Sequence, residues 1–182
     1  AYFGDGAANQ GQVYESFNMA KLWDLPVIYA IENNQYAMGT SVDRSASEPD
    51  FYKRGESFRI PGIQVDGMDV LAVRGAAEEA MAWTQAGKGP IILELLTYRY
   101  RGHSMSDPAK YRSKEEVQGY REGNDPIDHA AKELEKLGVR EEELKAIDKE
   151  IKDIVVEAAK FAEDAPEPAP AELYTDVLVE SY

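Results

Sequence analysis

Short, continuous runs of apolar residues alternate with segments of helical periodicity along the first two thirds of the chain. The runs are Tyr2-Phe3, 26–31 and 90–97, and residues 63–67 predict a further short strand and turn. Runs this short, without polar alternation, are typical of strands buried on both faces of a parallel sheet. Apolar residues spaced by three or four predict helices between the runs, over 11–23 and after Asp69. This repeated strand, helix, strand order predicts an α/β fold with a doubly wound parallel sheet.

The pattern changes after the last apolar run. Residues 98–112 are basic and aromatic with little periodicity, which predicts a long loop. Amphipathic helices are then expected from Ser113 and over 126–137 and 140–165, followed by a Pro-rich stretch and a short strand or docking segment at 173–179. The predicted organisation is therefore an α/β domain (1–112), a C-terminal helical region (113–165), and a Pro-rich linker with a terminal segment (166–182).

Polar segments directly follow two successive predicted strands. Gly4-Asp5-Gly6 forms a glycine turn after the first strand. Asn33-Asn34 lies near the start of a polar loop, 32–47, that follows the second strand. Ligands of open α/β sheets bind at the carboxyl ends of the strands. A carboxylate and an amide oxygen suit Mg²⁺, which takes its remaining ligands from water and phosphate. Asp5 and Asn34 are therefore predicted to share a Mg²⁺ ion that holds a diphosphate. Taken singly, Asp5 also fits a helix-capping turn residue and Asn34 a strand-end amide.

Composition excludes several functional classes. The 182 residues carry a net charge of −14, so the chain is poorly suited to neutralising nucleic-acid phosphates. Without cysteine, neither a disulfide framework nor a thiolate metal site can form. No apolar stretch reaches the length of a membrane span and no targeting segment is recognisable. Ala1-Tyr2-Phe3 reads as the tail of a buried strand, so the chain is expected to begin inside a domain.

Three segments together resemble a known enzyme family. They are Gly4-Asp5-Gly6-Ala7-Ala8-Asn9-Gln10-Gly11, then Glu32-Asn33-Asn34-Gln35-Tyr36-Ala37-Met38-Gly39-Thr40-Ser41, and Tyr98-Arg99-Tyr100-Arg101-Gly102-His103-Ser104-Met105-Ser106-Asp107-Pro108. They are similar to the thiamine-diphosphate motif and following loop of the 2-oxo acid dehydrogenases, over residues 1 to about 165. Within that family, α subunits of the pyruvate dehydrogenase first component are the nearest match.

The resemblance implies roles for particular residues. Mg²⁺ would be bound by Asp5, the Asn34 side chain and the Tyr36 backbone carbonyl. His103 would lie over the reactive thiazolium, where it would move protons or orient the acceptor lipoyl group. The cofactor-binding set implied in this way is Gly4, Asp5, Gly6, Ala7, Asn34, Tyr36, Met38, Gly39 and His103. Arg99, Arg101 and Arg112 would either fix the His103 loop or attract an acidic carrier domain.

The resemblance also implies a reaction and partners. The reaction would be decarboxylation of pyruvate and reductive acetylation of a lipoyl group on the acyltransferase component. The chain would act only with a β subunit, in an α2β2 heterotetramer of the cytoplasm or mitochondrial matrix, because that subunit supplies the carboxylate for the aminopyrimidine ring. The upstream half of such a subunit is absent here, so this chain should form a half-site. Alternatives are an acetoin or branched-chain 2-oxo acid dehydrogenase, or a truncated fragment that only scaffolds assembly.

Overall fold

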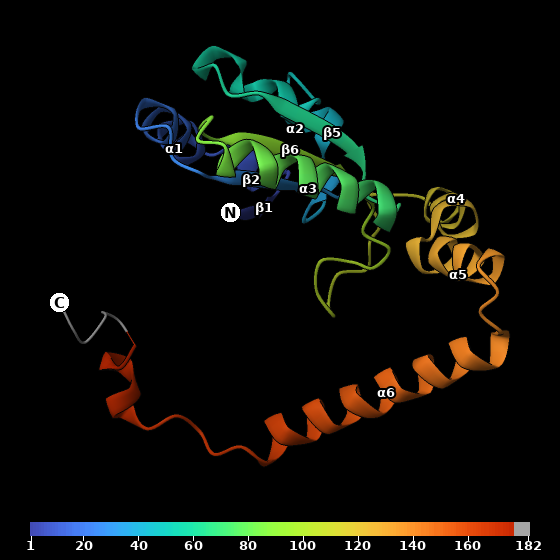
Figure 1. Ribbon diagram of the computed structural model, residues 1–182. Coiled ribbons are helices and arrows are strands. Elements are labelled where there is room, and N and C mark those ends of the chain that lie inside the picture. Colours follow the sequence, from blue (N-terminus) through green and yellow to red (C-terminus); the bar gives the residue numbers. More distant parts are fainter. Residues whose placement is uncertain (177–182) are drawn as a thin grey trace. The chain divides into compact units, whose positions relative to one another are not determined.

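The computed structural model describes residues 1–176 and divides into two compact units (Figure 1). The first comprises residues 1–133, and the second starts at Leu134. All residues of the predicted cofactor site belong to the first unit. Residue–residue contacts divide the chain after residue 133. The expected three-part division at 112 and 165 remains a prediction.

The first unit is built on a parallel sheet, as the apolar runs predict. Its strands are β1 (Tyr2–Gly4), β2 (Ile28–Asn33), β6 (Ile91–Leu96) and β5 (Gly62–Asp66), adjacent in that order. All three pairings are parallel. β2 and β6 pair over their full lengths, from Ile28 opposite Ile91 to Asn33 opposite Leu96. The α/β fold with a parallel sheet is thereby confirmed.

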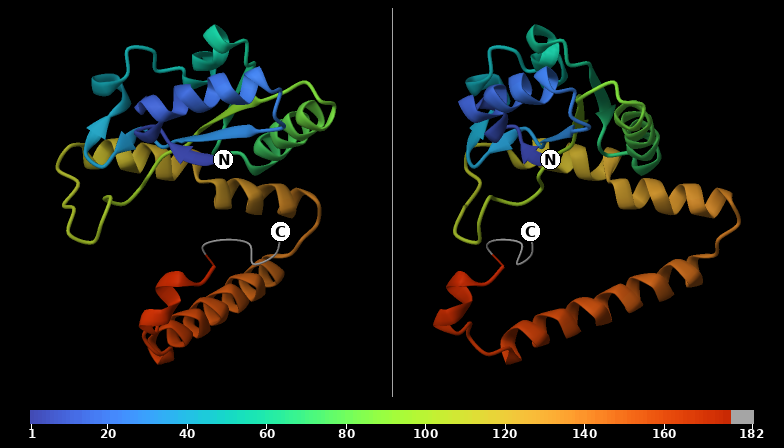
Figure 2. Two further views of the ribbon diagram at one scale, coloured as in Figure 1. Left: turned by 90° about the vertical axis from the view of Figure 1, so that its left-hand side faces the viewer. Right: turned by 60° about the vertical axis from the view of Figure 1, so that its left-hand side comes forward.

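Helices cover both faces of this sheet (Figure 2). One face packs against α1 (Gly11–Leu22) and the 3₁₀ helix η2 (Phe51–Phe58), and the other against α3 (Val70–Gln85). Phe17 of α1 meets Tyr29 of β2 edge to face, with ring centroids 4.7 Å apart. Burial of such apolar faces, rather than helix propensity, holds these helices in place.

Residues 32–47 do not form the loop that their polarity suggests. They contain a small antiparallel hairpin, β3 (Tyr36–Ala37) with β4 (Thr40–Ser41), and a short helix, α2 (Val42–Ser45). The side-chain oxygens of Asn33 and Asn34 each accept a hydrogen bond from the backbone N–H two residues later. Such Asx turns reverse the chain without any apolar periodicity, which is why the pattern missed the hairpin.

The remaining elements are helical. They are η1 (Ala7–Asn9), α4 (Lys114–Asn124), α5 (Pro126–Lys136), α6 (Glu141–Asp164) and η3 (Pro170–Tyr174). The Ser113 side chain accepts a hydrogen bond from the Glu116 backbone N–H, so the predicted capping start is confirmed.

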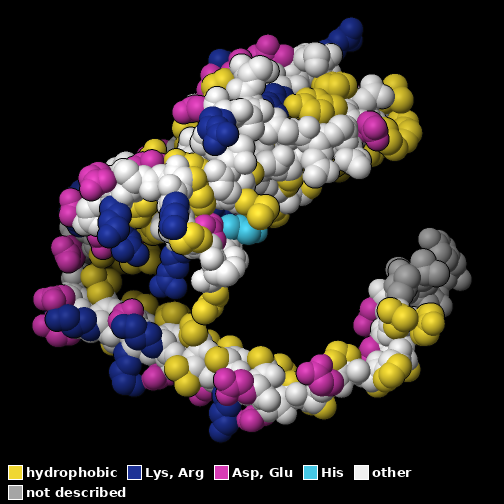
Figure 3. Space-filling view, turned by 180° about the vertical axis from the view of Figure 1, so that it is seen from behind, with side chains coloured by type: hydrophobic (Ala, Val, Ile, Leu, Met, Phe, Trp, Pro, Cys, Tyr) yellow, Lys and Arg dark blue, Asp and Glu magenta, His cyan; other side chains and the backbone are white. Residues whose placement is uncertain are grey.

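The long helix α6 dominates the second unit and carries charged and hydrophobic side chains (Figure 3). Ile147, Ile151 and Ile154, which gave the helical periodicity, are exposed. Leu173 and Tyr174 lie in η3, so the short strand expected at 173–179 is wrong at these two residues, whereas the alternative of a docking segment stays a prediction. The rest of that prediction, from 177 onward, falls outside the described residues.

Candidate functional site

The two predicted ligand segments meet where β1 and β2 end. Gly4 pairs with Glu32, which places Asp5 beside the chain that leaves β2. Asp5 is only 3% exposed, and its carboxylate lies near the Asn34 backbone. The Asn34 N–H itself donates to the Glu32 carbonyl at 3.0 Å. Burial raises the pKa of Asp5, while its own backbone N–H, that of Asn34 and the charge of Arg99 partly oppose the rise. Among residues 1–176, Asp5 has no Lys or Arg within ion-pair distance, so this buried carboxylate lacks a bound counter-charge.

The other two predicted ligand atoms lie on the turn that follows. The Asn34 side-chain oxygen accepts a hydrogen bond from the Tyr36 backbone N–H at 3.2 Å. The Tyr36 carbonyl oxygen accepts one from Nη1 of Arg99 at 2.9 Å. Each of these oxygens has a second lone pair for a cation. The described residues contain no group of three or more His, Cys, Asp or Glu side chains that could hold a metal. The predicted Mg²⁺ ligands would instead combine one carboxylate with an amide and a carbonyl.

The glycine turn is pressed against the hairpin. A Cβ built on Gly6 would lie 2.5 Å from the Cβ of Ala37, whereas one on Gly4 would meet nothing closer than 3.9 Å. Ala7 is exposed at the start of η1. Only glycine at position 6 therefore allows the Asp5 turn and β3 to approach this closely.

Gly6→Ala should accordingly disturb the turn in a way that can be repaired. We expect a loss of about 1–3 kcal/mol in the free energy of unfolding, typical of forcing a methyl group into a filled space. Removing the opposing methyl group in Gly6→Ala/Ala37→Gly should recover part of that loss, apart from the flexibility that the new glycine adds. Denaturant unfolding measures this, and a double variant less stable than the sum of both single changes would contradict it.

Met38 and Gly39 occupy the tip of the hairpin. Met38 has a left-handed backbone (φ +53°) and a side chain that is 65% exposed. Its carbonyl accepts a hydrogen bond from Arg99. The Tyr111 ring packs against Gly39, 2.9 Å from where a Cβ would stand. The structure thus leaves the Met38 side chain free to contact a ligand.

Arginines fix the loop 98–112 to this hairpin. Arg99 bonds to the carbonyls of Tyr36 and Met38 and to the Tyr111 hydroxyl. Arg112 bonds to the carbonyls of Arg99 and Tyr100 and lies over the rings of three tyrosines, Tyr36, Tyr98 and Tyr111. Of the two roles left open by the sequence, Arg99 and Arg112 therefore fix the loop, whereas Arg101 is exposed.

His103 lies at the exposed end of the same loop. Its backbone N–H donates to Asp107 Oδ2 at 2.7 Å, and the same carboxylate accepts from the Ala109 N–H and the Tyr111 hydroxyl, each at 2.8 Å. These hydrogen bonds lower the pKa of Asp107 to about 2. The structure brings Asp5, Asn34 and Tyr36 together, but it records no hydrogen bond from the His103 ring to any of them.

The depressed pKa of Asp107 predicts how the loop responds to acid. An acid whose pKa is lower in the folded state stabilises the fold above its unfolded value, here the ordinary 3.8. That contribution is lost as the pH falls toward about 2. The His103 amide resonance, followed by NMR, should report this protonation as a step centred near pH 2, the folded-state pKa of Asp107. Asp107→Asn should abolish this step, and an unchanged titration in that variant would contradict the assignment.

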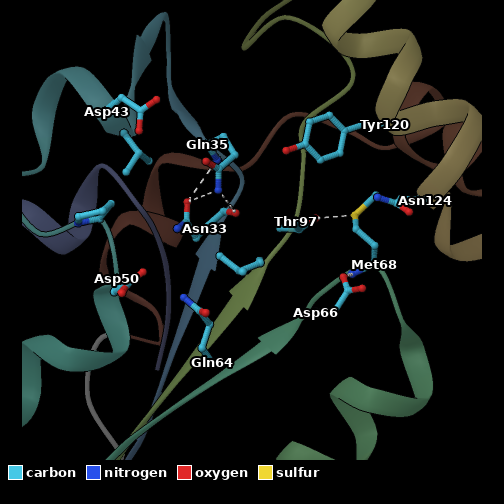
Figure 4. A pocket seen from close by; sticks show the side chains of 13 residues that line it. Asn33, Gln35, Asp43, Asp50, Gln64, Asp66, Met68, Thr97, Tyr120 and Asn124 are labelled. Atoms are coloured by element: carbon cyan, nitrogen blue, oxygen red, sulfur yellow. Dashed lines mark hydrogen bonds between the residues drawn. The ribbon is translucent and has the colours of Figure 1, made fainter.

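A pocket of about 410 Å³ with mixed polar and apolar lining lies beside Asn33 (Figure 4). Asn33, Gln35, Gln64 and Asp66 line it at the carboxyl ends of β2 and β5. None of the predicted ligands Asp5, Asn34 and Tyr36 lines it. The pocket therefore adjoins the predicted metal position without containing it.

A comparison with family models decides the ancestry of the chain. Residues 1–171 match the model described as "Dehydrogenase E1 component". The chain belongs to the dehydrogenase E1 component family. This confirms the resemblance that the three motif segments indicate, and the family is dependent on thiamine diphosphate.

Three curated relatives of this E1 component chain are named as pyruvate dehydrogenase E1 component subunit alpha. This chain is 66% identical over 180 residues to "Pyruvate dehydrogenase E1 component subunit alpha" of Rhizobium meliloti (strain 1021), covering 98% of this chain and 52% of that protein. For the protein of the same name from Zymomonas mobilis subsp. mobilis, identity is 62% over 182 residues, with 100% and 51% covered. The mitochondrial form from Schizosaccharomyces pombe is 52% identical over 183 residues, with 98% and 44% covered. The chain thus spans about half the length of the curated relatives it matches.

The sequence pattern does not predict two contacts near this E1 component site. Its basic character places Arg99 in a cationic loop but does not identify it as the donor to the Tyr36 carbonyl. The apolar run 90–97 predicts a strand but not the contacts of Glu94, a fully buried carboxylate on β6. The signal available for Glu94 was its charge inside the run 90–97, since charged residues are almost never fully buried without partners. Within residues 1–176, no helix is long and apolar enough to cross a membrane.

Proposed function

We propose that this chain is part of the α subunit of a pyruvate dehydrogenase first component and carries half of its thiamine-diphosphate site. The reaction would be decarboxylation of pyruvate and reductive acetylation of the lipoyl group of the acyltransferase component. One observation carries the proposal: a buried Asp5 carboxylate without a counter-charge lies beside Asn34 at the carboxyl edge of a parallel sheet. The shared name of the curated relatives supports pyruvate as the substrate.

Mg²⁺ would be held by Asp5, the Asn34 side-chain oxygen and the Tyr36 carbonyl. This set fits the ion, because all three are oxygen donors and the carboxylate supplies the negative charge that burial leaves uncompensated. The backbone of Gly4, Gly6 and Ala7 would approach the diphosphate, and Met38 and Gly39 would lie by the cofactor ring. Arg99 would keep the Tyr36 carbonyl in place through its other lone pair.

Thiamine diphosphate, when bound, supplies the carbon nucleophile and the electron sink for decarboxylation. The chain's own residues hold and orient it. His103 would hold or move a proton at its imidazole during transfer to the lipoyl group, or orient that group. The exposed position of His103 supports access to a large acceptor.

A β subunit would complete the site, most simply in an α2β2 heterotetramer. As the matched relatives include bacterial and mitochondrial proteins, the assembly would work in a bacterial cytoplasm or a mitochondrial matrix. No nucleic-acid or membrane partner is proposed.

Calorimetry tests the proposal on the chain co-purified with its β subunit. Thiamine diphosphate should bind only when Mg²⁺ is present, and the complex should turn over pyruvate faster than acetoin or branched-chain 2-oxo acids. A preference for acetoin or a branched substrate would reassign the enzyme within its family. Absence of cofactor binding in the complex would leave a scaffold fragment.

A further inference from the structure

Asn33, the first asparagine of the pair, has no ligand role in the proposed site. It is 2% exposed and bonded at both ends of its amide. Its Nδ2 donates to Oε1 of Glu94 at 2.8 Å. Its Oδ1 accepts from the backbone N–H of Gln35 at 3.3 Å and from Nε2 of Gln35 at 3.0 Å (Figure 4). Asn33 therefore links the sheet interior to the turn that carries Asn34.

Glu94 lies at 0% exposure in the middle of the sheet, on β6. Besides Asn33, its carboxylate accepts from the Tyr52 backbone N–H at 3.0 Å and from Nε2 of Gln64 at 3.1 Å. In the part of the chain that the structure describes, no Lys or Arg forms an ion pair with it. Burying a carboxylate among neutral donors costs desolvation free energy, which an apolar residue at the same place would not.

A carboxylate at this position fixes the direction of the Asn33 amide. The carboxylate oxygens of Glu94 accept all three hydrogen bonds that reach them, so the NH₂ end of Asn33 faces Glu94. The oxygen end must then face Gln35, where it receives both donors. Gln35 has φ +74°, a left-handed backbone that non-glycine residues adopt rarely. The two hydrogen bonds from Gln35 hold this conformation.

We propose that Glu94 is a positioning residue for the metal site: acting through Asn33, it sets the turn that presents the Asn34 side-chain oxygen and the Tyr36 carbonyl. The turn passes from Asn33 through Gln35 to Tyr36, whose N–H is bonded to the Asn34 oxygen. The inference rests on the proposed function, because it concerns binding at that site.

The test uses Glu94→Gln, which retains size but replaces one accepting oxygen with a donor. That NH₂ group must face either Asn33 or the donors of Tyr52 and Gln64. Mn²⁺ binding to the complex with the β subunit, in the presence of thiamine diphosphate, is followed by electron paramagnetic resonance. We expect affinity to fall about tenfold, the lower range for a residue that orients a metal ligand, with kcat at saturating cofactor within about threefold of wild type.

Gln64→Ala is the matched control. It removes one donor from Oε2 of Glu94 and leaves the bond between Asn33 and Oε1 in place. Thermal unfolding is measured for each variant, so that affinities are compared where all are folded. Gln64→Ala should leave Mn²⁺ affinity within about twofold of wild type, whereas Asn33→Ala should reproduce the loss caused by Glu94→Gln. The double variant Asn33→Ala/Glu94→Gln should be no weaker than the weaker single variant, since both interrupt one route.

Three results would overturn the inference: a Glu94→Gln affinity within twofold of wild type, an equal loss in Gln64→Ala, or multiplicative losses in the double variant. If Glu94→Gln does not fold, Asn33→Ala alone decides by the same twofold and tenfold criteria. Failure of the wild-type complex to bind either Mn²⁺ or thiamine diphosphate would instead refute the proposed function, and this inference with it.

Discussion

Asp5→Asn should remove Mg²⁺-dependent retention of thiamine diphosphate while leaving the α/β unit folded. Asparagine keeps the size of the side chain and one oxygen acceptor but lacks the charge that the metal needs. Loss of an orienting partner costs about 10–100-fold in metal affinity, so losing a charged ligand should cost at least about 100-fold. Cofactor binding by calorimetry, with and without Mg²⁺, measures the effect in the complex with the β subunit.

Stability of the cofactor-free protein should move in the opposite direction. Burial raises the pKa of Asp5, which means that the fold disfavours its ionised form. Near neutral pH the neutral asparagine avoids that cost. We expect the free energy of unfolding to rise by about 1 kcal/mol, and Tm to equal or exceed the wild-type value. Stability gained as binding is lost is the usual relation at functional sites.

Glu32→Gln is the control for Asp5→Asn. It removes the same charge from an exposed position on β2, directly opposite Gly4 in the sheet. If Asp5 coordinates the metal, Glu32→Gln should leave cofactor binding nearly unchanged. If negative charge acts only in a general way, Glu32→Gln and Asp5→Asn should lose similar amounts of cofactor affinity. Unaltered Mg²⁺-dependent binding in Asp5→Asn would refute the metal assignment.

His103→Ala should slow acetyl transfer to the lipoyl group and spare cofactor affinity. General acid–base catalysis contributes about 10²–10⁴-fold in rate, and a loss in that range is expected. The loop should keep its conformation, because its hydrogen bond to Asp107 comes from the backbone of His103 and not from the ring. Stopped-flow transfer rates and calorimetry on the same complex separate the two effects.

His129→Ala provides the matched control for His103→Ala. His129 lies on α5, and its ring nitrogen pairs with the Gly123 carbonyl at 3.2 Å. Neither rate nor affinity should change in this variant. Equal losses of transfer rate and cofactor affinity in His103→Ala would argue for a structural role of the histidine.

Much of the fold could be predicted because burial leaves a local signature. The apolar run at 90–97 became β6, and Asp69 accepts hydrogen bonds from two N–H groups at the start of α3. Elements whose apolar residues lack a regular spacing left no such signature. The 3₁₀ helix η2 is an example: its Phe51 is fully buried, and its Arg54 also bonds to the Ala8 carbonyl and the Tyr14 hydroxyl.

The same distinction applies to the candidate site. Asp5 and Asn34 could be paired because adjacent parallel strands end at one edge, and the turns that carry them are marked by Gly and Asn. The contacts of Arg99 with Tyr36 and of Glu94 with Asn33 join residues 63 and 61 positions apart. They depend on the register of β6 against β2, which no local pattern encodes.

The register of β2 and β6 has a consequence for altering this protein. Successive strand residues point to opposite faces, so a single-residue insertion or deletion before Glu94 would turn its carboxylate toward α3 and away from Asn33. Changes in the length of β6 should thus be tolerated only in pairs. When homologous chains are recombined, a crossover within either strand must likewise preserve the parity of its residues.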